Sequence, residues 1–311
     1  MARPLRISYP GALYHVTARG NEKKDIYKND RDRKKFLEYL KSATERYGAR
    51  IHVYCLMSNH YHLLLETPDG NLSEIMRHIN GAYTTYYNIK RGRSGHLLQG
   101  RYRALLVEAD EYAEELSRYI HLNPVKAGII EKPEAYNWSS CQDYYGTRPS
   151  PDWLQQDFLL SYFGKKQTIA RQRYREFCKR ALGQKIKNPL DNVIGSTFLG
   201  SQEFVEYIKE KYLAEKKADR NLPALNRLVS QPTIDSIYNA VRSEFSEESD
   251  VRQASLYLSH NYSGRRLKEI GEYFSIGESG VSQASGRMGR RIEADKQLRQ
   301  KIEKIRRGLN L

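Results

Sequence analysis

Residues 51–66 read Ile51-His-Val-Tyr-Cys-Leu-Met-Ser-Asn-His-Tyr-His-Leu-Leu-Leu-Glu66. Two runs rich in apolar and aromatic residues flank Ser58-Asn59, a pair of residues typical of a tight turn. The sequence therefore predicts a β-hairpin with strands at 51–57 and 60–66. Because side chains alternate between the two faces of a strand, His60 and His62 are expected to project from one face and Tyr61 from the other.

The segments around this hairpin alternate between strand and helix patterns. A strand is predicted at 12–19, and a helix from the capping pair Asn29-Asp30 to about Tyr47. A second helix is predicted at 72–90, a fourth strand at 102–108, and a further helix that stops before Pro124. The order β-α-β-β-α-β predicts an α+β fold of the ferredoxin-like split βαβ type, a four-stranded sheet with two helices on one face. Its other face is expected to be free to be covered or used.

The pattern changes at Pro149-Ser-Pro151, where we expect a domain boundary. Residues 149–230 are predicted to be a helical, basic connector, and residues 231–311 an all-α domain. Within the last block, residues 267–274, the turn Ser275-Ile-Gly277 and a second helix from Glu278 have the pattern of a helix-turn-helix. The predicted domains are therefore 1–148, 149–230 and 231–311.

The composition limits the classes of protein that this chain can represent. Its 311 residues include 52 Lys and Arg against 37 Asp and Glu, a formal charge of +15. This balance favours a polyanion partner, most often nucleic acid, although a merely soluble basic protein has the same composition. No apolar run suits a membrane span or a secretory leader. The three cysteines are widely spaced, so we expect a cytoplasmic protein without disulfides or a zinc finger.

Two further features suggest chemistry. The paired imidazoles of His60 and His62 suit a divalent metal, although a His-x-His pair also arises by chance. Tyr119 and Asn123 are four residues apart and share one face of a predicted helix. A tyrosine hydroxyl can act as a nucleophile and an amide oxygen can ligate a hard metal, but an ordinary core tyrosine fits the same pattern. Tyr112, two turns earlier, is the alternative nucleophile.

Several separated motifs together resemble one family. The motifs are 58–65 around the two histidines, Gly100-Arg-Tyr-Arg103, and Arg118-Tyr-Ile-His-Leu-Asn-Pro-Val-Lys-Ala-Gly128. In order and spacing they resemble the single-tyrosine HUH transposases, and within these the REP-associated tyrosine transposases of bacteria. Tyr61 stands where the motif has a bulky apolar residue. The resemblance covers about residues 12–145 and includes the strand Tyr14-His-Val-Thr-Ala-Arg-Gly20.

The resemblance implies a metal-dependent reaction on DNA. It implies that His60, His62 and Asn123 bind Mg²⁺ or Mn²⁺ and that Tyr119 attacks a single-stranded DNA phosphate. The expected products are a 5′-phosphotyrosine and a free 3′-hydroxyl, and the expected partner is hairpin-bearing, REP-like DNA in the nucleoid. One tyrosine per chain is compatible with a monomer or with a homodimer.

Two basic regions are predicted to contact DNA. The segment 89–107 carries Arg91, Arg93, Arg101 and Arg103 without an acid, which suits phosphate contacts but also a solvated loop. The last helical block resembles the helix-turn-helix domain of the bacterial replication initiator, which implies contact with duplex DNA through Ser282, Gln283 and Arg287. A dimerising or regulatory role for this block is the alternative.

Three functions remain open from the sequence. The set of His60, His62, Tyr119 and Asn123 favours a transposase-type strand transferase that cleaves and rejoins single-stranded DNA. A non-catalytic, sequence-specific DNA-binding regulator would need none of these four residues. A metal nuclease that releases free ends would need no tyrosine.

Overall fold

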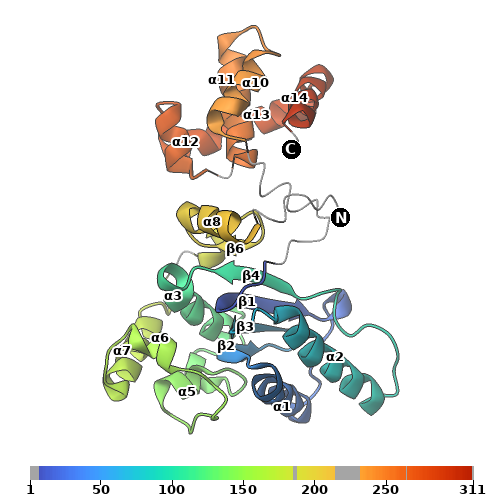
Figure 1. The fold of residues 1–311 in the computed structure, drawn as a ribbon, viewed down its shortest axis with the longest axis vertical. Helices are drawn as coiled ribbons and strands as arrows, with labels where there is room; N and C mark the ends of the chain where they lie inside the picture. The colour runs from blue at the N-terminus through green and yellow to red at the C-terminus, as the bar shows by residue number, and fades with distance from the viewer. Residues whose placement is uncertain (1–6, 185–187, 214–231, 264, 310–311) are drawn as a thin grey trace. The chain divides into compact units, whose positions relative to one another are not determined.

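A computed structural model describes residues 7–184, 188–213, 232–263 and 265–309. The chain divides into two compact units, of which the first extends to Val205 and the second begins at Glu206. Figure 1 shows the elements along the chain. The two units are described separately below.

A single mixed sheet organises the first unit. Its first four strands are β1 (Ala12–Arg19), β2 (Arg50–Leu56), β3 (His60–Thr67) and β4 (Arg103–Val107), in the spatial order β2-β3-β1-β4 with all neighbours antiparallel. This is the predicted split βαβ topology, so the predicted α+β fold class is confirmed. The short turn at Ser58-Asn59 joins β2 to β3 as the sequence predicts.

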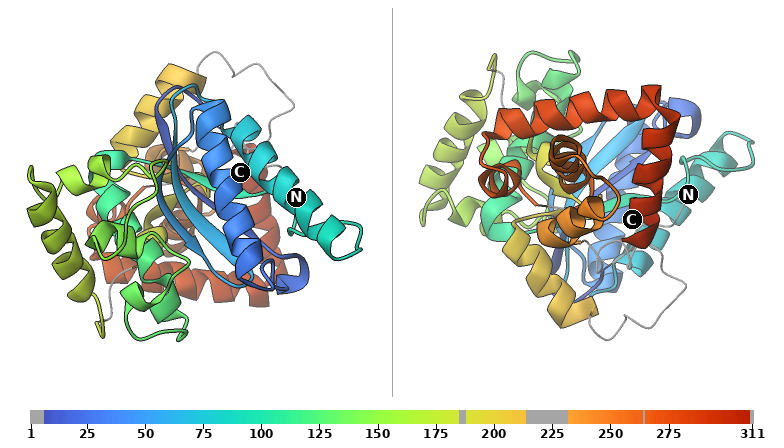
Figure 2. Two further views of the ribbon diagram at one scale, coloured as in Figure 1. Left: turned by 90° about the horizontal axis from the view of Figure 1, so that it is seen from below. Right: turned by 90° about the horizontal axis from the view of Figure 1, so that it is seen from above.

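Two long helices, α1 (Asp30–Tyr47) and α2 (Leu72–Lys90), cover one face of the sheet (Figures 1 and 2). The side chain of Asn29 caps α1 by accepting a hydrogen bond from the Asp32 amide, and Gly48 ends it in the left-handed region. An aromatic cluster that includes Phe36 of α1, Tyr61 of β3 and Tyr83 of α2 is buried between the layers. Burial of these large side chains fixes the two helices on the sheet.

The opposite face of the sheet is largely covered, whereas the sequence analysis did not predict whether it would be covered. Helices α3 (Ala109–His121), α5 (Cys141–Tyr145), α6 (Asp157–Ser161) and α7 (Gln167–Lys179) pack there, as Figure 2 shows. Their apolar residues form one core with Val53 and Leu64 of the sheet. The short helix α4 (Asn123–Lys126) follows α3, with 3-10 turns η1 (Asn21–Lys23) and η2 (Pro133–Ala135) elsewhere in the unit.

The prediction that residues 149–230 are helical is wrong in part. After the 3-10 turn η3 (Pro189–Asn192), strands β5 (Val193–Ile194) and β6 (Phe198–Leu199) extend the sheet to six strands, with β6 parallel to β4. Residues 149–205 belong to the same compact unit as the sheet and do not form a separate connector. Residues 185–187 and 214–230 of the predicted connector lie outside the described residues, and the predicted functional division of the chain stays a prediction.

The second unit is helical in its described part. After α8 (Gln202–Ile208), which crosses the division between the units, and the π-helical turn η4 (Lys209–Leu213), it contains α10 (Ile234–Arg242), α11 (Glu248–Tyr262), α12 (Leu267–Tyr273), α13 (Glu278–Ala294) and α14 (Lys296–Gly308). Val281 of α13 packs in one buried cluster with Ile270 and Phe274 of α12 and the segment that follows it. Helices α12 and α13 thus lie at the positions predicted for the two helices, and their assignment as a helix-turn-helix stays a prediction.

The structure bears on two expectations from the sequence, one about the cysteines and one about membrane-spanning helices. Cys55, Cys141 and Cys178 are buried free thiols, in agreement with the prediction of no disulfide. Among the described residues, no helix combines the length and apolarity that crossing a bilayer requires.

Candidate active site

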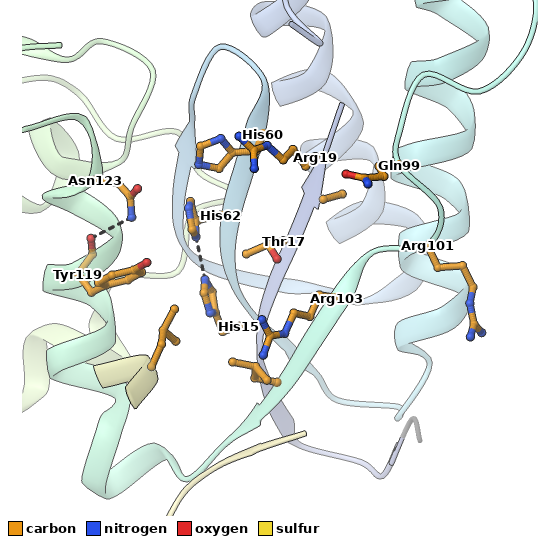
Figure 3. Close-up of a pocket in the computed structure, with 13 residues that line it drawn as sticks. His15, Thr17, Arg19, His60, His62, Gln99, Arg101, Arg103, Tyr119 and Asn123 are labelled. Atoms are coloured by element: carbon orange, nitrogen blue, oxygen red, sulfur yellow. Dashed lines mark hydrogen bonds between the residues drawn. The ribbon is translucent and has the colours of Figure 1, made fainter. Parts of the chain in front are cut away.

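A pocket of about 500 Å³ opens on the sheet face beside α3. The register of the strands builds it, because Arg19 pairs with His60, Thr17 with His62, and Thr17 also with Arg103 of β4. Alternation along each strand then points all of these side chains to the same face. The lining residues, most of them labelled in Figure 3, are His15, Thr17, Ala18, Arg19, His60, His62, Gln99, Arg101, Arg103, Leu105, Tyr119, Asn123 and Leu190.

His60 is held with one ring nitrogen available to the pocket. Its Nδ1 lies 2.7 Å from Oδ1 of Asn59, and Nδ2 of Asn59 donates to the Lys23 carbonyl over 2.9 Å. Because an amide oxygen only accepts, Nδ1 of His60 must carry the hydrogen, which leaves the lone pair on Nε2. Burial and the Arg19 charge lower the pKa of His60, so its ring is neutral at neutral pH.

His62 is held in a similar way by His15, a residue that the sequence analysis did not select. Nδ1 of His62 lies 2.9 Å from Nε2 of His15, and the two ring planes are 7° apart with centroids at 5.2 Å. This geometry is an in-plane hydrogen bond between two buried rings. It occupies Nδ1 of His62 and leaves its Nε2 facing the pocket. Burial, with the neighbouring His15 and His60, holds the pKa of His62 well below its usual range.

Tyr119 faces the two histidines from α3. Its ring meets that of His62 edge to face with centroids 5.9 Å apart, and that of His15 at 6.3 Å. Burial raises the pKa of the Tyr119 hydroxyl. The nearby Asn123 side chain opposes the rise, while the Asp191 carboxylate adds to it. The hydroxyl is therefore protonated at neutral pH. Tyr112 does not line this pocket, but packs against the core beneath α3.

Asn123 begins α4 one turn after Tyr119. Its Nδ2 donates to the Tyr119 carbonyl over 3.4 Å, which leaves Oδ1 able to accept or ligate. Within the described residues there is no group of three or more His, Cys, Asp or Glu side chains that could hold a metal. Two imidazole Nε2 atoms and one amide oxygen on one pocket nevertheless match the predicted donor set of His60, His62 and Asn123. These donors suit a divalent ion that keeps open positions.

The predicted phosphate-binding arginines separate into two groups. Arg101 and Arg103 line the pocket. Arg91 instead pairs, together with Lys90, with the fully buried Asp32, and its guanidinium lies 4.1 Å from the Tyr87 ring centroid. Arg93 is exposed next to the same ring and outside the pocket. Arg91 is thus engaged in holding the end of α2 to α1.

Two cationic residues at or beside the pocket were not predicted from the sequence. Arg19 lines the pocket from the end of β1. Lys126 places its ammonium 4.7 Å from the centroid of the Tyr119 ring, and burial and the nearby Arg118 lower the pKa of Lys126. Period-2 alternation in the strand 12–19 could have revealed His15, Thr17 and Arg19 as neighbours on one face.

The three residues predicted to contact duplex DNA lie on the exposed side of α13. Ser282, Gln283 and Arg287 are exposed on α13, whereas Val281 and Ala284 are buried. Ser279 and Arg290 extend this exposed face along the helix. The face combines hydroxyl, amide and guanidinium groups, which are the side-chain types that reach bases and phosphates.

The fold and the pocket together define an α+β domain whose sheet carries a basic site lined by histidines and a tyrosine. Residues 8–123 match the model of a family described as IS200-like transposases. The resemblance recognised in the sequence is thus confirmed over these residues, which are similar to those transposases.

The chain was also compared with solved structures and with curated proteins. A solved structure of a REP-associated tyrosine transposase bound to a REP hairpin is similar at 16% identity with a TM-score of 0.42, covering 53% of this chain and 98% of that one. A search of curated proteins finds no match.

Proposed function

We propose that this protein is a transposase-type strand transferase that cleaves and rejoins single-stranded, hairpin-bearing DNA of the REP type. One observation carries the proposal, namely that a single pocket brings together His60, His62, Tyr119 and Asn123 with arginines on its rim. The match of residues 8–123 to IS200-like transposases supports the same class of reaction.

In the proposed reaction, the Tyr119 hydroxyl attacks a DNA phosphorus. The new bond joins the tyrosine oxygen to the phosphorus as the hydroxyl proton passes to solvent. The bond to the 3′ oxygen breaks, and this oxygen takes up a proton and leaves as a hydroxyl. The 5′ end stays on the protein as a phosphotyrosine. Because the ester retains the reactivity of the cleaved bond, another 3′-hydroxyl can displace Tyr119 and rejoin the strand without ATP.

The residues of the pocket divide the remaining tasks. His60, His62 and Asn123 would hold Mg²⁺ or Mn²⁺, which supplies charge neutralisation at the phosphate when bound. Arg19, Arg101 and Arg103 surround the pocket with positive charge, which favours the approach of the DNA backbone. Asn59 and His15 fix the orientation of the two histidine rings.

The experiment that tests this function uses the full chain, a hairpin single strand labelled at its 3′ end, and Mg²⁺ or Mn²⁺. The fragment that stays on Tyr119 carries the original 3′ end and therefore the label. A labelled band that migrates with the protein on a denaturing gel is the expected result. Free cleaved ends without an adduct would indicate a metal nuclease instead. Binding without cleavage would favour the alternative, a non-catalytic DNA-binding regulator.

His15→Phe is expected to weaken Mn²⁺ binding about 10- to 100-fold, because the hydrogen bond that orients His62 is lost. His15→Gln offers a polar group at the same place and should recover part of the affinity. The measurement is Mn²⁺ titration by electron paramagnetic resonance, beside a melting curve. Equal Mn²⁺ affinity in the wild type and in His15→Phe would show that this bond does not support the metal site.

We also propose that α12 and α13 bind duplex DNA, such as a hairpin stem, through the exposed face of α13. Ser282 and Gln283 would meet base edges and Arg287 a phosphate. The exposure of all three, against the buried Val281 and Ala284 on the other side of the helix, supports this assignment.

Arg287→Ala is expected to weaken binding of a hairpin and to reduce the slope of log affinity against log salt by about one unit. Fluorescence anisotropy over a series of salt concentrations measures both quantities. Arg307→Ala, at an exposed position of α14, is the matched control with the same change in charge. Identical salt slopes for Arg287→Ala and Arg307→Ala would show that α13 does not contact DNA through Arg287.

A further inference from the structure

Two polar side chains of α3, Ser117 and His121, are fully buried and have no part in the reaction proposed above. They are four residues apart and share one face of the helix. Tyr119 lies midway between them in the sequence, and therefore about 200° from each around the helix axis. The side of α3 that faces away from Tyr119 thus carries polar groups in the interior of the protein.

His121 forms hydrogen bonds at both ring nitrogens. Its Nδ1 lies 2.7 Å from the hydroxyl oxygen of Tyr174 in α7, and its Nε2 lies 2.8 Å from Oγ of Ser140, immediately before α5. Oγ of Ser140 accepts in turn from the backbone amide of Tyr54 in β2 over 3.0 Å. The imidazole therefore joins the helix that carries Tyr119 to the sheet on one side and to α7 on the other.

Counting donors and acceptors gives the direction of each hydrogen bond. Ser117 donates its hydroxyl hydrogen to the Glu114 carbonyl over 2.7 Å, so it accepts from the Tyr174 hydroxyl over 3.1 Å. Tyr174 then has no hydrogen left for His121, and its oxygen accepts from Nδ1–H of the ring. Nε2 keeps the lone pair and accepts from the Ser140 hydroxyl. A neutral imidazole thus satisfies every group in one continuous chain.

We call the four linked residues the His121 network, and all of them are fully buried: Ser117, His121, Ser140 and Tyr174. A buried polar group that loses its partner cannot turn to water, so the network opposes any rotation or sliding of α3. Apolar neighbours such as Leu116 and Ile120 restrain the helix less, because apolar contacts have no preferred direction. The network therefore fixes the rotation of α3 about its axis.

The rotation of α3 decides where the Tyr119 hydroxyl lies. In the pocket, the Tyr119 ring meets only the ring edges or faces of His62 and His15, with centroids 5.9 and 6.3 Å away. Contacts of this kind still allow the helix to turn slightly. A displacement of a reacting group by about 1 Å can lower a rate about 100-fold.

We infer that His121 is a positioning residue for the strand transfer, which holds α3 at the rotation that directs the Tyr119 hydroxyl towards the phosphate. The inference rests on the proposed function for the role of Tyr119. Two members of the network, Ser140 and Tyr174, lie beyond residue 123, where the match to IS200-like transposases ends. Because the network is buried and does not touch DNA, its loss should slow the chemical step and leave DNA binding unchanged.

Tyr174→Phe tests the inference and has a matched control. The change removes the hydroxyl that holds Nδ1 of His121 and keeps the ring. Tyr144→Phe also removes the hydroxyl of a fully buried tyrosine in the same core, but this hydroxyl donates to the His52 carbonyl over 3.0 Å and not to α3. The two variants should melt at similar temperatures.

Two variants of His121 complete the set. His121→Leu removes both hydrogen bonds of the ring. His121→Gln keeps an amide oxygen that can accept from Ser140 and an NH₂ group that can donate to Tyr174. Since His121→Leu leaves buried polar groups without partners, the conclusion is drawn from Tyr174→Phe and His121→Gln if His121→Leu does not fold.

The experiment uses the full chain, a hairpin labelled at its 3′ end and Mn²⁺, and measures the rate of adduct formation over a series of DNA concentrations. Tyr174→Phe is expected to lower the maximal rate about tenfold and His121→Leu about 100-fold, at an unchanged half-saturating DNA concentration. His121→Gln should recover most of this loss. Tyr144→Phe should keep the wild-type rate.

Nuclear magnetic resonance of the full chain with ¹⁵N-labelled histidine tests the network without DNA. The wild type should show a slowly exchanging imidazole N–H signal that is absent from His121→Gln. Tyr174→Phe should make this N–H exchange rapidly, because its acceptor is lost, whereas Tyr144→Phe should leave it protected.

Three results would overturn the inference. The first is an equal maximal rate in Tyr174→Phe and Tyr144→Phe, and the second is a Tyr174→Phe variant that loses DNA affinity at an unchanged maximal rate. The third is an imidazole signal that Tyr174→Phe does not alter. A wild type that forms no adduct would overturn the proposed function and this inference with it, whereas an adduct at the wild-type rate in every variant would overturn this inference alone.

Discussion

Tyr119→Phe is expected to abolish the covalent protein–DNA adduct while leaving DNA binding and stability nearly unchanged. The change removes one oxygen and keeps the ring that lies edge to face with His62 and His15. Among the described residues, Tyr119 is the only tyrosine that lines the pocket, so the loss should be complete rather than partial. A denaturing gel measures the adduct, and anisotropy with the same labelled hairpin measures binding.

Tyr112→Phe is the matched control for this prediction. Tyr112 lies two turns earlier on the same helix, but it does not line the pocket and packs against the core. The Tyr112→Phe variant should form the adduct at the wild-type rate. An adduct that persists in Tyr119→Phe and disappears in Tyr112→Phe would transfer the nucleophile to Tyr112.

The architecture of residues 12–121 follows from local signals in the sequence. The capping Asn29, the Ser58-Asn59 turn and the helical spacing of apolar residues fixed the predicted elements to within a few residues of those observed. Once the strands are paired, alternation brings His60 and His62 to one face. The split βαβ order then places α3, with Tyr119, beside them.

The added strands β5 and β6 could not be predicted in the same way. Each has two residues, too few for an alternating pattern, and β6 is held by parallel pairing with β4 about ninety positions earlier in the sequence. The 3-10 turn before them also brings Leu190 to the pocket and the Asp191 charge close enough to raise the Tyr119 pKa. Such contacts depend on tertiary structure rather than on local sequence.

Arg91 shows that a basic run in the sequence does not reveal the partner of each of its arginines. The basic run of 89–107 predicts phosphate contacts for each of its arginines, but the partner of Arg91 is the buried Asp32 of α1. A buried carboxylate without a cation would be costly, so this pairing takes priority over solvent or DNA. His15 is the opposite case, a residue that was not predicted for the site but belongs to it. Its position in a strand carries no special signal, and only its hydrogen bond to His62 makes it part of the site.

His60→Ala and His62→Ala are each expected to reduce metal-dependent cleavage by about three orders of magnitude or more. A metal ion at the phosphate is worth several kcal/mol of transition-state stabilisation, and each 1.36 kcal/mol changes the rate about tenfold. Cleavage rate and Mn²⁺ affinity should fall together, whereas binding of the hairpin should change little. Cleavage at several Mn²⁺ concentrations, with anisotropy beside it, measures all three quantities.

The two variants should differ in stability, and this difference separates a metal site from a structural one. His62 is buried and hydrogen-bonded to His15, so its removal leaves a cavity and should lower the melting temperature more than removal of the half-buried His60. His78→Ala is the control, since His78 of α2 is bonded to Ser42 and lies outside the pocket. If His60→Ala melts like the wild type and still cleaves at the wild-type rate, His60 is not a metal ligand. If His62→Ala melts far lower and also still cleaves, His62 is structural and the metal lies elsewhere.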